Sequence, residues 1–156
     1  MKIPKSMEAE LSKWNCGNGV DLETWINGSG NFSLAVGYTT IFWPNFVSFD
    51  GYILQSGFSE SELRKFESRE GITKKTIEWI NNHLHLSNIH HGECEDISKD
   101  KLVILGDTLK EIYEAKLKLQ FPNNPCVVEF YIPEDKDDLW EYQISFWQLC
   151  HEEVEK

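Results

Sequence analysis

Five side chains that can bind a metal or act as nucleophiles lie in one short stretch of the chain. They are His83, His85, His90, His91 and Cys94, with Glu93, Glu95 and Asp96 among them. Imidazole and thiolate are good zinc ligands. Their spacing matches no zinc pattern, however, and the two rings of an H-x-H pair on a helix point about 200° apart. We interpret the stretch as a polar helix end and a solvated loop, and keep a small metal-dependent enzyme as the alternative.

Other signatures of catalysis or cofactor binding are missing from the sequence. There is no G-x-S-x-G motif, and the glycine-rich segments at 17–19 and 28–30 lack the third glycine of a dinucleotide-binding loop. With 26 acidic side chains, no single carboxylate pair stands out as an acid–base couple. The four cysteines, which form no C-x-x-C pair, are Cys16, Cys94, Cys126 and Cys150. We predict no catalytic residue, no cofactor and reduced thiols.

The charge balance excludes further classes of ligand. The 156 residues carry 15 basic and 26 acidic side chains, a formal net charge of −11. Nucleic acid binding needs clustered Lys and Arg, so a nucleic acid ligand is disfavoured. No apolar run is long enough to span a membrane, and the first 30 residues lack the apolar core of a signal peptide. We predict a cytoplasmic protein that does not bind membranes.

Most of the net charge lies near the C-terminus. Residues 129–156 hold 2 basic and 9 acidic side chains, a net of −7. Five of these carboxylates surround one predicted turn: Glu134, Asp135, Asp137, Asp138 and Glu141. Such a patch can dock a basic protein, with an aromatic side chain as anchor. Trp140 and Trp147 have opposite parity in the strand that follows, and we assign Trp147 as the anchor. The alternative is a solvated turn that only keeps the protein soluble.

Hydrophobic periodicity predicts the elements. Alternating apolar residues indicate strands at 32–38, 47–53, 126–132 and 140–146, with the first two forming a hairpin. Ser59 with Glu62 forms a capping box for a helix to about residue 70, Gly71 ends it, and a second helix begins near Thr73. A third helix covers 98–120, and its apolar stripe consists of Leu102, Leu105, Leu109, Ile112 and Leu119. Asp21 caps a brief helix through Ile26.

The order of these elements predicts an α+β fold. Along the chain they run β-β-α-α-α-β-β, with no βαβ alternation, which favours an antiparallel sheet of about four strands with the helices packed on one face. The length suits one domain, and we expect residues 1–156 to form a single α+β domain. The oligomeric state stays open.

The segment at residues 30–54, GNFSLAVGYTTIFWPNFVSFDGYIL, resembles a set of small acidic bacterial proteins of the toxin-immunity type. The resemblance continues at residues 105–112 and 144–147 and so covers most of the chain. It implies a cytosolic binding protein that neutralises a basic toxin domain, such as a nuclease, rather than an enzyme. A generic protein-interaction domain is the other alternative.

Overall fold

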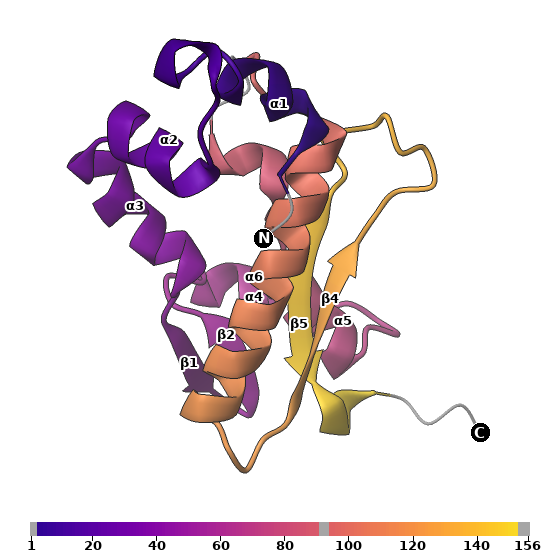
Figure 1. Cartoon of the computed structure of the whole chain (residues 1–156). Helices are drawn as coiled ribbons and strands as arrows, with labels where there is room; N and C mark the ends of the chain where they lie inside the picture. The colour runs from indigo at the N-terminus through magenta and orange to yellow at the C-terminus, as the bar shows by residue number, and fades with distance from the viewer. Residues whose placement is uncertain (1–2, 91–93, 153–156) are drawn as a thin grey trace.

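The computed structural model describes residues 3–90 and 94–152 and has an α+β fold (Figure 1). The helices are α1 (Lys5–Leu11), α2 (Leu22–Ser29), α3 (Phe32–Phe42), α4 (Glu60–Glu67), α5 (Lys74–Asn82) and α6 (Lys99–Gln120). The strands are β1 (Phe46–Phe49), β2 (Tyr52–Gln55), β3 (Leu84–His85), β4 (Cys126–Tyr131) and β5 (Gln143–Gln148). Short 3-10 turns η1, η2 and η3 cover Asn15–Gly17, Leu86–Ile89 and Leu149–His151. None of the helices in the described ranges is both long enough and apolar enough to cross a bilayer.

The predicted strand at 32–38 is wrong, because these residues begin α3. The side chain of Asn31 accepts a hydrogen bond from the backbone N–H of Leu34 at 2.9 Å, which caps the helix. Phe32 and Val36, which the strand prediction placed on a buried face, are 92% and 68% exposed. The helix ends before Pro44, since proline disfavours helical geometry in the residue that precedes it.

The strand predicted at 47–53 is instead a complete hairpin of β1 and β2. Asp50 and Gly51 form its turn with positive φ angles of 49° and 83°, the geometry that Asp-Gly pairs favour. One face of the hairpin contributes Phe46 and Ile53 to the main core. The other face packs with α4 and α5 in a second, smaller core. The strand β1 therefore pairs with β2, and the predicted hairpin between 32–38 and 47–53 is wrong.

The strands form two small antiparallel sheets within the described residues, not one sheet of about four strands. One is β1-β2 and the other has the order β3-β5-β4. The long helix α6 covers one face of β5 and β4, and α5 covers the other (Figure 1). All six residues of β5 are buried as a result. The prediction that the helices lie on one face is therefore wrong as well.

Two side chains of α5 join the two sheets, and we call this contact the seam. Glu78, which is 0% exposed, accepts hydrogen bonds from the backbone N–H groups of Ile53 in β2 and Gln148 in β5, both at 2.8 Å. One turn later, Asn82 donates to the carbonyls of Ile53 and Phe146. These bonds satisfy backbone groups at the facing edges of the two sheets, which would otherwise be buried without partners.

The predicted helices at the centre of the chain are confirmed with small shifts at their ends. Ser59 and Thr73 cap α4 and α5 through the N–H groups of Glu62 and Thr76. The apolar stripe of α6 includes Leu102 and Leu109, as expected, and buries Gly106, Tyr113 and Leu117 as well. Leu119, assigned to that stripe from its spacing, is 72% exposed.

Candidate functional surface

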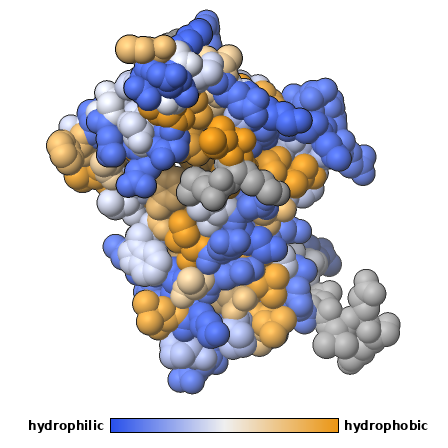
Figure 2. Space-filling model, viewed as in Figure 1, coloured by the Kyte–Doolittle hydropathy of each residue, from blue (hydrophilic) through white to orange (hydrophobic). Residues whose placement is uncertain are grey.

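The five predicted partner-binding carboxylates lie together on the loop between β4 and β5, which we call the acidic loop. Glu134, Asp135, Asp137, Asp138 and Glu141 are all exposed. The loop projects at the upper right of the molecule and forms a hydrophilic protrusion there (Figure 2). Within the described chain, Lys99 is the one basic side chain that comes within 4.0 Å of a carboxylate of this loop, at Asp137. The loop therefore keeps an excess of negative charge toward solvent.

Local hydrogen bonds shape the acidic loop. Asp135 accepts from the backbone N–H of Asp137 at 3.0 Å, and Asp138 accepts from that of Trp140 at 3.2 Å. The hydroxyl of Tyr142, which begins the return to β5, donates to the carbonyl of Lys136 at 2.9 Å. Burial raises the pKa of the Tyr142 phenol, and the negative charges of Asp137 and Asp135 raise it further. The carboxylates are thus presented from a hydrogen-bonded turn.

The expectation that Trp147 is an exposed anchor is wrong. Its side chain is 5% exposed, its indole N–H donates to Glu152 at 3.2 Å, and the ammonium of Lys75 lies 4.4 Å from its ring. It also lies six residues along β5 from Glu141, a span of about 20 Å in an extended strand. Trp140, within the acidic loop, is 51% exposed. The structure thus places Trp140, and not Trp147, beside the carboxylates.

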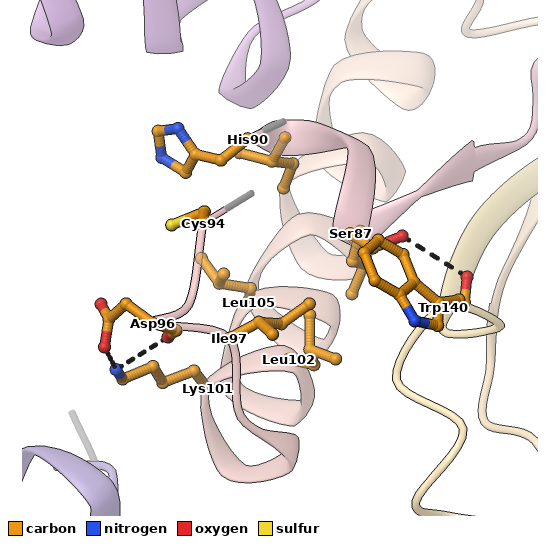
Figure 3. Close-up of a pocket in the computed structure, with 11 residues that line it drawn as sticks. Ser87, His90, Cys94, Asp96, Ile97, Lys101, Leu102, Leu105 and Trp140 are labelled. Atoms are coloured by element: carbon orange, nitrogen blue, oxygen red, sulfur yellow. Dashed lines mark hydrogen bonds and ion pairs between the residues drawn. The ribbon is translucent and has the colours of Figure 1, made fainter. Parts of the chain in front are cut away.

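Trp140 also forms one wall of an open apolar recess (Figure 3). We call it the Trp140 recess. It has a volume of about 210 Å³ and lies between η2, the segment at 94–97 and the first turns of α6. Its apolar lining consists of Leu86, Ile89, Ile97, Leu102 and Leu105, and its polar lining of Ser87, His90, Cys94, Asp96 and Lys101. A dry apolar cavity of about 150 Å³ can hold benzene, so this recess has the size for one large apolar side chain.

Hydrogen bonds hold the two ends of the recess. At one end, the carbonyl of Trp140 accepts from His85 Nδ1 at 2.8 Å and from the hydroxyl of Ser87 at 3.5 Å. At the other end, Lys101 forms an ion pair with Asp96 and donates to its carbonyl at 3.0 Å (Figure 3). The first contacts join the acidic loop to β3 and η2. The second join the segment before α6 to that helix. The recess and the acidic loop are therefore adjacent, and Trp140 belongs to both.

The structure separates the histidines and the cysteine of the 83–94 stretch. His83 follows the end of α5 and His85 lies in β3, so their rings are 5.3 Å apart edge to face rather than on opposite sides of a helix. His90 lies 2.6 Å from the hydroxyl of Tyr38. Across residues 3–90 and 94–152, no three His, Cys, Asp or Glu side chains converge as metal ligands would. His91 and Glu93 lie outside the described residues.

Sequence reasoning missed the recess because its walls are distant in the chain. Leu86 lines it from within the 83–94 stretch, Leu102 from α6, and Trp140 from the β4–β5 loop. Opposite parity in a strand indicates that one of the two tryptophans is exposed, but it does not say which one. The chain matches no family model, no curated protein and no solved structure, so the acidic loop and the recess are interpreted from their geometry alone.

Proposed function

We propose that the chain is a cytosolic binding protein of the immunity type, which docks on a basic toxin domain and neutralises it. The observation that carries the proposal is the continuity of the acidic loop with the Trp140 recess. Carboxylates around an apolar recess offer charge for steering and a pocket for an anchor, the two features that specific protein interfaces combine.

The mechanism is steric and electrostatic. The carboxylates of Asp135, Asp137, Asp138 and Glu141 pair with Lys or Arg side chains that in a nuclease would otherwise contact phosphates. A large apolar side chain of the partner enters the Trp140 recess and is buried against Leu102 and Leu105. The charges raise the association rate and make it sensitive to salt, whereas the anchor slows dissociation.

The test is capture of partners from the native cytosol at low and at high salt, followed by binding measurements with the captured protein. We expect a stoichiometric basic partner whose association slows as salt rises. Reversing two charges in D137K/D138K should weaken its binding by about tenfold or more, since close charge pairs at such interfaces couple by at least about 1.5 kcal/mol. The matched control is E111K/E114K, which makes the same change in net charge on exposed positions of α6.

Three results would count against the proposal. Equal binding of the loop variant and the control would remove the acidic loop from the interface. A Leu105→Trp variant, which fills the recess without changing charge, should also bind more weakly, and unchanged binding would remove the recess. The absence of any partner at either salt concentration would remove the immunity-type function itself.

A further inference from the structure

The helix α3 has an apolar face that no other part of the described chain covers. Ile41 and Phe42 on its inner side pack against the main core. On the outer side, Phe32 is 92% and Val36 is 68% exposed, and Ile26 in the second half of α2 is 54% exposed. Apolar side chains gather accordingly over α2 and α3 at the left edge of Figure 2. Exposed apolar side chains that adjoin one another mark interaction sites, which indicates that this face has a partner.

The exposed face combines a protruding ring with a hollow. The hollow has a volume of about 230 Å³ and lies between the end of α2 and the start of α3, where Ile26, Gly30 and Ala35 are among its lining residues. Phe32 stands at its edge and points largely into solvent. A hollow of this size accommodates a phenyl ring. The Phe32 ring and the hollow are neighbours. Two copies related by a twofold axis can therefore each insert Phe32 into the hollow of the other copy, as an isologous interface requires.

The charge pattern favours a second copy as the occupant. None of the residues between Glu23 and Asp50 is Asp, Glu, Lys, Arg or His, although the whole chain carries a net charge of −11. Two copies repel each other wherever their charged surfaces approach within about one Debye length, roughly 8 Å at physiological salt. The uncharged face is where they can meet at the lowest electrostatic cost. A lipid surface is a poorer match, since interfacial helices carry Lys and Arg on their polar side.

We infer that the outer face of α3 and the end of α2 form a homodimer interface. The α3 helices cross over Val36, Gly37 and Thr40, where a Cβ placed on Gly37 would meet nothing within 4 Å, so a second helix can approach closely. A buried aromatic contributes about 150–250 Å². The whole patch offers several hundred Å², below the roughly 800 Å² per partner of a standard interface. We therefore expect a weak dimer.

This interface goes beyond the proposed function, because it uses none of the acidic-loop residues. In Figure 1, α2 and α3 lie on the left and the β4–β5 loop at the upper right. A dimer formed through α3 leaves both acidic loops free for a partner. The two interfaces also respond oppositely to salt, since screening weakens attraction between opposite charges and relieves repulsion between like charges.

Sedimentation velocity of the full chain between about 5 and 500 μM tests the inference, because a weak dimer dissociates on dilution. We expect the sedimentation coefficient to rise with concentration, and to rise at lower concentration when salt is increased. Val36→Glu places two carboxylates against each other in the dimer and should weaken association at least about tenfold. Leu119→Glu is the matched control, because Leu119 is also apolar and is 72% exposed, but lies at the far end of α6.

Far-UV circular dichroism shows whether each variant keeps its helices, and Phe32→Ala serves as a second interface variant without an added charge. A wild-type monomer over the whole concentration range overturns the inference, as does equal association of Val36→Glu, Phe32→Ala and the control. If the monomer instead sediments with phosphatidylcholine vesicles, the face belongs to a lipid surface and the dimer is wrong.

Discussion

Replacing Glu78 by glutamine should strongly destabilise the protein, although the two side chains have nearly the same shape. The carboxylate of Glu78 accepts four hydrogen bonds and so uses all its acceptor positions. Oε1 accepts from the N–H of Ile53 and the side-chain amide of Gln148, at 2.8 and 2.7 Å, and Oε2 from the N–H of Gln148 and Nδ1 of His151, both at 2.8 Å. A glutamine offers one acceptor oxygen and places an NH₂ group against the other two donors.

The magnitude follows from these two donors. His151 can shift its proton to Nε2 and accept a hydrogen bond from the new amide. The backbone N–H of Gln148 then has no acceptor, and neither has the second amide N–H of the glutamine, which faces it. One buried donor left unsatisfied costs about 1–3 kcal/mol, and two cost about 2–6 kcal/mol. We therefore expect Glu78→Gln to lower the free energy of unfolding by about 3 kcal/mol, a large part of the roughly 5–15 kcal/mol that keeps a domain folded.

Urea unfolding at pH 7, followed by circular dichroism and tryptophan fluorescence, measures this change by linear extrapolation. Glu114→Gln is the control, because Glu114 is exposed on α6 and its replacement should alter stability by less than about 0.5 kcal/mol. A loss below about 1 kcal/mol for Glu78→Gln would refute the reasoning, since the seam would then not depend on a four-fold acceptor.

Three further predictions concern the core and the response to pH. In Gly106→Ala the new Cβ would lie 2.2 Å from ring carbons of Phe130, so the free energy of unfolding should fall by about 1–3 kcal/mol. Adding Phe130→Leu to this variant should restore part of the lost stability. An unchanged midpoint of urea unfolding would contradict the close contact. Burial raises the pKa of Cys126 to about 12. The folded chain then keeps a proton that the unfolded chain loses near pH 9, so the free energy of unfolding should fall as pH rises above about 9. Iodoacetamide should also label Cys126 more slowly than the three exposed cysteines, and equal labelling of all four would disprove this. The backbone N–H of Ser6, followed by the hydroxyl of Ser98, holds the pKa of Asp100 below its usual value, so its contribution is present above about pH 4 and lost on acidification. The stability deficit of Asp100→Asn relative to wild type should therefore be largest at pH 7 and shrink as the pH is lowered below about 4, and a difference independent of pH would argue against this role.

Local signals were sufficient for the elements whose ends and faces depend on near neighbours. The capping box at Ser59 and the spacing of apolar residues predicted α4, α5 and α6, because a helix is made of contacts three and four residues apart. The strand β4 follows from its alternation. The strand predicted at 140–146 is found as β5, which begins only at Gln143, ends at Gln148 and is buried on both faces. The Asp50-Gly51 pair is also a local signal, since Asp-Gly favours the two-residue turn of the β1–β2 hairpin.

The same kind of signal failed at 32–38 because short apolar segments fit either period. Phe32, Leu34 and Val36 alternate as in a strand, but Asn31 caps a helix there, and an uncharged sequence has no polar face to reveal the helical period. If α3 pairs with a second copy, the apolar outer face that caused the error is itself part of an interface.

The sequence by itself determined the α+β class, the position of most elements and the exposure of the acidic loop, since these depend on periodicity, caps and local charge. Tertiary structure alone decided that Trp147 is buried and Trp140 is exposed, that the strands separate into two sheets, and that a recess adjoins the acidic loop. The physical reason is the separation of the groups involved. Glu78 meets the N–H of Ile53 25 positions away and that of Gln148 70 positions away, and no local pattern encodes such contacts.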